Sequence, residues 1–294
     1  MVPSGAMQRI LVKKQKENER ACMDLVVDIG NSETVFGMVQ KEGLEIVDHW
    51  RIKTSKARTA DEQESLLNAI MSSRGFSKDS VRRAVIGSVV PSHTATVVKG
   101  LERLLKDDCI IVDSKSSLPI DLDVEEPLTV GVDRLLNTLA AKVIFNKDIL
   151  VVDFGTATSF DCITSEGVFI GGVIAQGIES GMEWLADKTA KLPSVELLPP
   201  DRVIGQRTEE CIQSGIFFSS VDAVDGIVTR IKKEWGTSEV IVVITGGYGE
   251  LVAPYLRTPN HLEPFLTLYG LALAGRFIED GRLGSVNTKG TSPR

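Results

Sequence analysis

Val26-Val27-Asp28-Ile29-Gly30 and Val151-Val152-Asp153-Phe154-Gly155 align without a gap. Each is a run of β-branched and apolar residues that ends in aspartate and glycine, which predicts a buried strand followed by a tight turn. After each turn come hydroxyl-bearing residues and a second strand, over 34–39 and 159–163. One copy alone is a common way for a strand to end. Two copies predict a duplicated phosphate-binding hairpin and two related lobes.

Between and after these hairpins, helical and strand patterns alternate, which favours an α/β fold. Helical spacing is found over 61–74, 94–105, 131–145, 182–190, 208–235 and 269–281. Thr59 or Asp61 can cap the first of these helices. Further strands are expected over 81–90, closed by Pro91, and over 109–113 and 239–245.

Composition excludes several classes of protein. The 294 residues are 43% hydrophobic and 25% charged, which excludes a wholly disordered chain. A net charge of −7 disfavours a nucleic-acid-binding protein. The four cysteines are far apart and only three histidines are present, so neither a zinc site nor a disulfide framework is expected.

The sequence also bears on location. No apolar run reaches the roughly 18–20 residues of a membrane span. Residues 1–22 lack the apolar core of a signal peptide, and are interpreted as a disordered extension or a remnant of cloning. A cytoplasmic location is therefore expected, with no membrane partner.

The first hairpin places Asp28 at a strand end, followed by Gly30, Asn31 and Ser32. An acidic residue there can hold a divalent cation through water, and glycine lets a phosphate approach the backbone. Asn31 and Ser32 add side-chain donors. For this tetrapeptide alone, an ordinary Asx-type turn is an equally good interpretation.

The second hairpin repeats this logic with Asp153, Thr156 and Thr158. Two glycine-containing stretches accompany it. Thr245-Gly246-Gly247 follows a predicted strand and fits either a nucleotide contact or a left-handed stop. Residues 171–177 fit either backbone passing beneath a ligand or close packing of a strand on a helix.

Gly131-Val132-Asp133-Arg134 stands at the start of a helix with an apolar face. The helix dipole and the flanking glycine favour an anion there. Asp133 can act as a general base on a substrate hydroxyl, while Arg134 holds an acidic substrate. From the residues alone, an ordinary first-turn carboxylate beside a solvated arginine explains the pattern at least as well.

Taken together and in this order, these segments resemble the type III pantothenate kinases, from about Asp24 to Gly275. This family belongs to the superfamily of acetate and sugar kinases, heat-shock chaperones and actin. The matching segments are DIGNSETVFG (28–37), RIKTSKARTADE (51–62), GSVVPS (87–92), GVDRLLNTLAA (131–141), DFGTATSFD (153–161), GGVIAQGIESG (171–181), AKLPSVEL (190–197), QSGIFF (213–218), TGG (245–247) and EPFLTLYGL (263–271).

The resemblance implies an actin-like, ribonuclease H-like α/β fold with two lobes and an active-site cleft between them. The expected division is an N-terminal lobe over 23–146, a C-terminal lobe over 147–283 and a polar tail over 284–294. It also implies ATP-dependent phosphorylation of pantothenate to 4'-phosphopantothenate, the first step of coenzyme A biosynthesis.

Roles carry over from the family to matching positions. Asp133 would be the catalytic base, and Arg134 with Gly131 and Val132 would bind pantothenate. Asp28, Gly30, Asn31 and Ser32 would lie near the ATP phosphates, with Mg²⁺ at Asp28. Asp153 would bind a monovalent cation, K⁺ or NH₄⁺, with Thr156 and Thr158 near the nucleotide. The family is dimeric, and Thr208 matches a threonine that reaches the partner's pantothenate pocket.

The chain departs from the family pattern at a few positions. Arg207 precedes Thr208 where the family has asparagine or aspartate, Gln176 replaces a proline, and Ser32 replaces a threonine. A tyrosine often seen against the substrate is missing from the segment 120–124. These departures keep two alternatives open: a non-catalytic or regulatory relative, and a kinase for another small hydroxy acid.

Overall fold

The computed structural model describes residues 23–237 and 239–287, so the predicted extension over 1–22 lies outside the described residues. The chain divides into two compact units. Among the described residues, unit 1 combines those up to Leu118 with Leu128–Leu136 and those from Thr267 onward, and unit 2 combines Pro119–Pro127 with those of Asn137–Leu266. The division expected from the sequence was continuous, with its boundary near 147. In the structure the last helix belongs to unit 1.

Unit 1 is built on a five-stranded sheet in the order β3-β2-β1-β4-β5. Its strands are β1 (Met23–Ile29), β2 (Glu33–Gln40), β3 (Ile46–Lys53), β4 (Val81–Ser88) and β5 (Ile110–Val112). β1 pairs antiparallel with β2, and β2 with β3, whereas β1–β4 and β4–β5 are parallel. The predicted hairpin of Asp28 is therefore the β1–β2 connection at the centre of the sheet.

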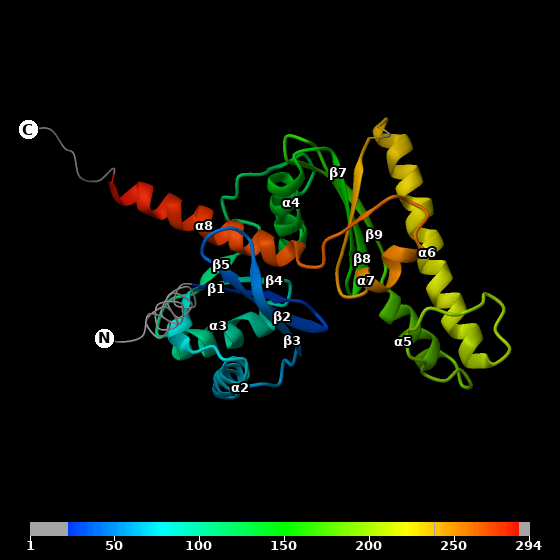
Figure 1. Ribbon diagram of the computed structural model, residues 1–294, viewed down its shortest axis with the longest axis horizontal. Coiled ribbons are helices and arrows are strands. Elements are labelled where there is room, and N and C mark those ends of the chain that lie inside the picture. The colour runs from blue at the N-terminus through cyan, green and yellow to red at the C-terminus, as the bar shows by residue number, and fades with distance from the viewer. Residues whose placement is uncertain (1–22, 238, 288–294) are drawn as a thin grey trace, which may run out of the picture. The chain divides into compact units, whose positions relative to one another are not determined.

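Helices cover both faces of this sheet (Figure 1). α2 (Ala60–Ser73) and α3 (Pro91–Leu105) pack on one face, against residues such as Leu25, Val27 and Ile29. Thr59 caps α2 in a capping box with Glu62. On the other face, a Cβ at Gly37 or Gly87 would press on side chains of α8 (Leu266–Asn287), so the strand glycines permit close packing of that helix.

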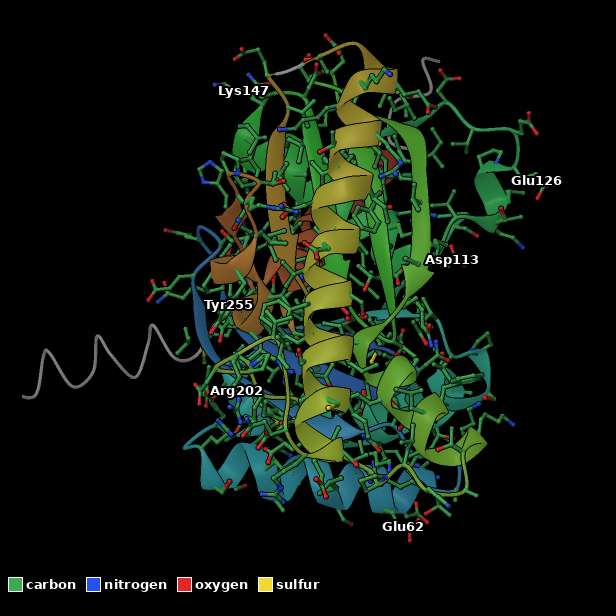
Figure 2. The ribbon with its side chains drawn as sticks, turned by 90° about the vertical axis from the view of Figure 1, so that its right-hand side faces the viewer. Glu62, Asp113, Glu126, Lys147, Arg202 and Tyr255 are labelled. Atoms are coloured by element: carbon green, nitrogen blue, oxygen red, sulfur yellow. The ribbon has the colours of Figure 1, made fainter. Side chains whose placement is uncertain are left out.

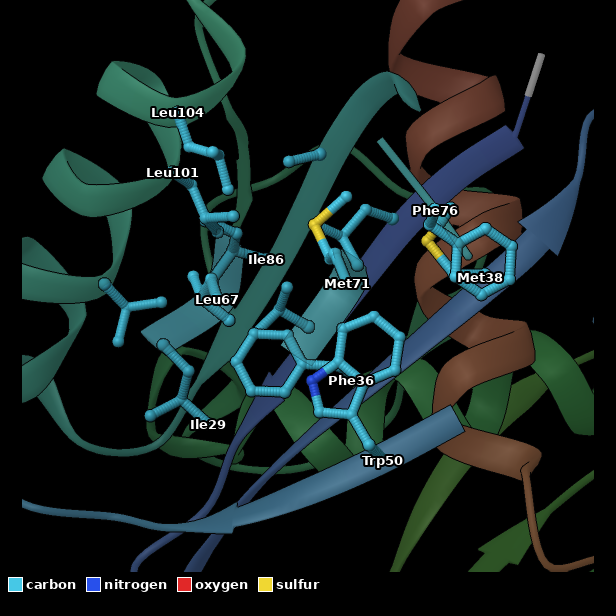
Figure 3. Packing of buried hydrophobic residues seen from close by; sticks show 14 of the residues in the cluster. Ile29, Phe36, Met38, Trp50, Leu67, Met71, Phe76, Ile86, Leu101 and Leu104 are labelled. Atoms are coloured by element: carbon cyan, nitrogen blue, oxygen red, sulfur yellow. The ribbon is translucent and has the colours of Figure 1, made fainter. Parts of the chain in front are cut away.

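The core between the sheet and α2 and α3 is aromatic and aliphatic (Figure 3). Phe36 stacks on Trp50 with ring centroids 5.5 Å apart. Leu67 and Met71 of α2 complete this cluster and are fully or almost fully buried. Burial of each such side chain contributes roughly 1.5–3 kcal/mol to folding.

Unit 2 repeats the strand order of unit 1. Its sheet runs β11-β10-β7-β8-β9-β6, so that β9-β8-β7-β10-β11 corresponds to β3-β2-β1-β4-β5. Antiparallel and parallel pairings fall at the same places. The strands are β6 (Asp121–Leu122), β7 (Ile149–Phe154), β8 (Ala157–Ile163), β9 (Val168–Gln176), β10 (Ile241–Thr245) and β11 (His261–Leu262). The duplication predicted from two pentapeptides is thus a duplication of topology.

Three α-helices lie wholly within the described part of unit 2: α5 (Ile178–Lys188), α6 (Thr208–Trp235) and the short α7 (Gly249–Val252). α6 runs lengthwise over the sheet (Figure 2) and packs Phe217, Val221, Val224 and Val228 onto Leu150 and Val152. α6 is also long and apolar enough to cross a membrane by length and composition, and 39% of its most apolar window is buried in the protein. A core helix of a soluble protein passes the same test.

α4 (Val132–Phe145) begins in unit 1 and continues into unit 2, with the division between Leu136 and Asn137. Most predicted elements are found with small shifts at their ends. β4 ends at Ser88 rather than Val90, because Pro91 is the first residue of α3 and not only a stop. α5 begins four residues before its predicted start, and α8 runs to Asn287, into the segment expected as a polar tail.

Candidate active site

The β1–β2 turn of unit 1 is held by backbone and by one threonine. The Gly30 N–H donates to the Glu33 carbonyl at 3.0 Å, and a Cβ at Gly30 would lie 2.9 Å from that same oxygen. Thr54, just after β3, donates through its hydroxyl to the Gly30 carbonyl at 2.8 Å, and through its N–H to the Ser32 carbonyl. The turn therefore requires glycine at position 30, and it leaves Asn31 exposed.

Asp28 lies two residues before this turn and is partly buried. In the parallel register it lies opposite Gly87 of β4, where a Cβ would touch Leu136 of α4 and Leu271 of α8. The missing side chain at Gly87 thus lets the first turns of α4 approach the sheet next to Asp28. The structure brings two predicted groups of unit 1 to one region: the hairpin of Asp28 and the start of α4.

The start of α4 is shaped around Asp133. A Cβ at Gly131 would collide with Asp133 Oδ1, so glycine is needed for this rotamer. The Arg134 N–H donates to the same oxygen at 2.9 Å. Burial raises the pKa of the Asp133 carboxyl above its ordinary value, although the N–H and the charge of Arg134 act in the opposite direction. A carboxylate with a raised pKa is a stronger base, as proton abstraction from an alcohol requires.

The β7–β8 turn of unit 2 is held differently. The Gly155 N–H donates to the Ala157 carbonyl at 3.1 Å, and a Cβ at Gly155 would meet that carbonyl only at 3.5 Å. Support comes instead from the start of α5. A Cβ at Gly177 would collide with the Thr156 carbonyl, to which the Ser180 hydroxyl donates at 2.9 Å. The glycine-rich stretch over 171–177 forms the second part of β9 and ends, at Gly177, in close packing against this turn.

Asp153 at the end of β7 is partly buried and contacts two other parts of unit 2. The Asn137 side-chain amide of α4 donates to Asp153 Oδ2 at 3.1 Å. A Cβ at Gly246 would collide with Asp153 Oδ1, and Gly246 has a φ of +88°. Of the two threonines predicted beside the nucleotide, Thr156 is exposed and Thr158 is buried.

These two aspartates suit hard cations. Mg²⁺ is held in many phosphate-transfer sites by one or two carboxylates, with waters and substrate phosphates as the other ligands. Among the residues that the structure describes, no group of three or more histidine, cysteine, aspartate or glutamate side chains could form a site by itself. A cation at Asp28 or Asp153 would thus share its coordination with water and nucleotide.

Thr208 begins α6 and is exposed, and Arg207 is the N-cap residue of that helix. The guanidinium of Arg207 lies 3.7 Å from the Glu209 carboxylate, and its side chain is largely exposed. Gln176 at the end of β9 is also exposed. None of these three positions is committed to the core, so each is available to a ligand or a second chain.

Sequence reasoning missed Asn137 and Thr54. Asn137 lies within an apolar helical stretch, where a single asparagine gives no signal of contact with a distant aspartate. Thr54 lies in the segment 51–62, which was noted only as part of the family resemblance. No cysteine was predicted to be catalytic, and burial raises the pKa of Cys109 to about 12, with nearby Glu102 adding to the shift.

The family model of the type III pantothenate kinases matches residues 24–230. This chain belongs to the type III pantothenate kinase family. The type III pantothenate kinase of Thermomicrobium roseum is 40% identical over 252 residues, covering 86% of this chain and 96% of that protein. That of Myxococcus xanthus is 39% identical over 253 residues, covering 85% and 97%. That of Exiguobacterium sp. is 37% identical over 251 residues, covering 85% and 97%.

Two solved structures share the fold of this chain. A conserved putative Baf family transcriptional activator from Campylobacter jejuni matches with a TM-score of 0.52 and 19% identity, over 87% of this chain and 99% of that one. The ethanolamine utilization protein EutJ from Carboxydothermus hydrogenoformans matches with a TM-score of 0.50 and 15% identity, over 86% and 90%. The chain is an α/β protein with two sheets in two units, and the expected α/β class with two related lobes is confirmed.

Proposed function

We propose that this chain transfers the terminal phosphoryl group of ATP to the primary hydroxyl of pantothenate, giving 4'-phosphopantothenate and ADP for coenzyme A biosynthesis. The observation that carries the proposal is the partly buried carboxylate of Asp133, whose pKa is raised and which is held by Gly131 and Arg134, within a chain of this family.

In the proposed reaction, Asp133 accepts the proton of the pantothenate hydroxyl while the hydroxyl oxygen forms a bond to the γ-phosphorus of ATP. The bond between that phosphorus and the β–γ bridging oxygen breaks, and ADP leaves. Arg134, with Gly131 and Val132, holds the acceptor. Because phosphoryl transfer is mostly positioning and charge neutralisation, one base and fixed donors are sufficient protein chemistry.

In this proposal, residues of the β1–β2 and β7–β8 hairpins bind the nucleotide. Asn31, Ser32 and the amides near Gly30 hold phosphates in unit 1, and Thr156 is the better placed of the two threonines in unit 2 because it is exposed. Asp28 would hold Mg²⁺ and Asp153 a monovalent cation, K⁺ or NH₄⁺. When bound, these cations offset the negative charge of the phosphates.

The proposed enzyme is a homodimer. Large apolar side chains are exposed on elements next to the start of α6: Trp184 of α5, and Val203 and Ile204 of the loop before α6, with Ile204 81% exposed. Apolar surface of this kind is typical of a protein interface. Thr208 follows this loop and is exposed, as a residue that serves a partner's acceptor site must be. A cytoplasmic location fits the supply of ATP.

The test is a coupled ADP-release assay on the purified chain with ATP and Mg²⁺, with and without pantothenate and K⁺, and with the product mass measured. We expect a product one phosphate heavier than pantothenate, formed only when pantothenate and K⁺ are present. Product from another hydroxy acid but not from pantothenate would favour the alternative kinase. A folded dimer that binds ATP and releases no ADP with any acceptor would favour a regulatory relative.

The dimer has its own test. Light scattering of the wild type is expected to give twice the chain mass, and Ile204→Asp is expected to give a monomer with circular dichroism like that of the wild type. Thr229→Asp, an exposed position farther along α6, serves as the control. A monomeric wild type would contradict the proposal for Thr208.

A further inference from the structure

Asn137 is a polar residue with no exposed surface in the middle of an apolar helix. Its neighbours Leu135, Leu136 and Leu139 of α4 are all buried. Burial of an amide costs free energy unless its groups form hydrogen bonds. The Asn137 Nδ2 meets this requirement through Asp153 Oδ2 at 3.1 Å, and a carboxylate oxygen can face only the NH₂ end of the amide.

The other oxygen of Asp153 faces a different element. In the parallel register Asp153 lies opposite Thr245, and the next residue, Gly246, takes a φ of +88°. A Cβ at Gly246 would collide with Asp153 Oδ1 and with the Phe154 backbone. One carboxylate oxygen therefore faces α4, and the other faces the turn after β10.

An amide is well suited to hold a carboxylate that must also bind a cation. A lysine or arginine at position 137 would offset the negative charge of Asp153, whereas a neutral donor fixes the orientation and leaves the charge. Groups that orient the ligands of a metal typically alter its affinity about 10–100-fold when they are replaced.

We propose that Asn137 is a positioning residue for monovalent-cation binding: it holds Asp153 Oδ2 so that Oδ1 is directed toward the turn at Gly246, where the cation is held. This inference rests on the proposed role of Asp153. α4 would then carry two functional residues one helical turn apart: the proposed base Asp133 and the positioning residue Asn137.

The test compares Asn137→Leu, which keeps the size and removes the donor, with Thr138→Val as a matched control at the next, equally buried polar position of α4. For Asn137→Leu we expect the K⁺ concentration for half-maximal activity to rise about 10–100-fold, with kcat at saturating K⁺ within about threefold of the wild type. The rise in melting temperature caused by K⁺ in the presence of Mg²⁺ and ADP should also be lost, which is a readout without turnover. Thr138→Val should keep both properties.

Asn137→Asp gives a second test that does not depend on the first variant folding. Two carboxylates would then face each other, so the K⁺ requirement should be far above that of the wild type at pH 8. It should approach the wild-type requirement as the pH falls, because a protonated Asp at 137 can donate as the amide does. The ratio to the wild type at each pH removes effects of other titrating groups.

Two results would overturn the inference. If Asn137→Leu keeps the wild-type K⁺ requirement and K⁺ stabilisation while Asp153→Asn loses both, Asp153 binds the cation and Asn137 has no part in it. If Asp153→Asn also keeps them, the proposed role of Asp153 fails and this inference fails with it.

Discussion

Units 1 and 2 share a strand order but hold their equivalent aspartates differently. In unit 1 the turn after Asp28 is tight at Gly30 and braced by Thr54, which comes from the end of β3. In unit 2 the turn after Asp153 has room at Gly155 and is braced by the start of α5, at Gly177 and Ser180. Duplication preserved the backbone path, and the bracing residues diverged. Equivalent positions in the two hairpins should therefore respond differently to the same substitution.

The units also differ in how a buried carboxylate ties distant segments together. In unit 1, Asp24 is fully buried and accepts from Arg82 and Arg83, which in turn bind Glu279 of α8. In unit 2, Asp225 of α6 accepts from the backbone and side chains of Arg257 and Thr258. Unit 1 relies on a network of charges, whereas unit 2 relies mainly on hydrogen bonds to one loop.

The largest effect is expected at the proposed base. Asp133→Asn should lower kcat by about 10²–10⁴, because it removes the proton acceptor and keeps the shape of the side chain. ATP binding measured by calorimetry should be close to that of the wild type. A kcat within threefold of the wild type would contradict the assignment of Asp133 as the base.

The two buried carboxylates, Asp24 in unit 1 and Asp225 in unit 2, should contribute different amounts to the stability of the protein. Asp24→Ala leaves two guanidinium groups without their buried partner and should destabilise the protein by about 3–5 kcal/mol. Asp225→Ala removes hydrogen bonds to a loop and should cost about 1.5–3 kcal/mol. Urea unfolding, followed through Trp50 for unit 1 and Trp235 for unit 2, measures both. Arg51→Ala, which breaks an exposed ion pair with Glu33, should cost less than about 1 kcal/mol.

The stabilisation of unit 2 by Asp225 should also depend on pH. Burial opposes ionisation of Asp225, but hydrogen bonds from Thr258 and Arg257 outweigh it, and the pKa of Asp225 lies below its ordinary value. A lowered pKa stabilises the fold above the ordinary carboxyl pKa, and this contribution is lost as the pH falls through the folded-state value. The difference in stability between wild type and Asp225→Asn should therefore shrink toward low pH. A constant difference would show that ionisation of Asp225 does not matter.

Substitutions of the two equivalent aspartates, Asp28 and Asp153, should affect the requirements for different cations. Asp28→Asn should raise the Mg²⁺ concentration for half-maximal activity at least about 10-fold and leave the K⁺ requirement unchanged. Asp153→Asn should do the reverse. Titration of each cation at saturating levels of the other distinguishes the two variants. If either variant shifts both requirements equally, the two hairpins do not have separate cations.

The equivalent glycines should show a smaller contrast. Gly30→Ala forces the Glu33 carbonyl to move and should cost about 1–3 kcal/mol, as overpacking usually does. Gly155→Ala makes only ordinary contacts and should change stability by less than about 1 kcal/mol. Thermal unfolding compares them directly. Equal losses in both variants would mean that the two turns are equally tight.

The smallest effect concerns the stability of the site in unit 1. Burial raises the pKa of Asp133, so its ionisation weakens the fold as the pH rises above the ordinary carboxyl pKa, and the loss is complete above the folded-state pKa. Asp133→Asn should therefore melt at a higher temperature than the wild type at pH 7. The gain should vanish below the ordinary carboxyl pKa of about 4. A lower melting temperature for Asp133→Asn at pH 7 would contradict this.

Local signals in the sequence were enough for much of the fold. The two pentapeptides predicted the duplicated hairpins, and α6 was predicted with its observed ends at Thr208 and Trp235. β3 was not predicted, because its sequence mixes Asp48, His49 and Arg51 into an edge strand whose alternation is weak. Pro91 was taken as a stop, although it is equally suited to the first turn of a helix.

The features that the sequence did not predict are contacts between segments far apart in the chain. The pairing of Asn137 with Asp153 joins a helix to a strand end, and no spacing in the chain encodes it. The same holds for the membership of α8 in unit 1, which depends on Gly37 and Gly87 accepting its leucines. The predicted roles of Asp28, Asp133 and Asp153 remain predictions, now with defined surroundings.

That membership of α8 has a consequence for how the protein is made. During translation, the five strands of unit 1 leave the ribosome first, but the helix that covers one face of their sheet comes after residue 266. This face of the sheet, which includes Val26, Val85 and the ion pair of Asp24 with Arg83, stays uncovered until all of unit 2 and then α8 have been synthesised. Unit 2 can be complete before unit 1, and the first-made sheet is the part of the nascent chain with most need of a chaperone.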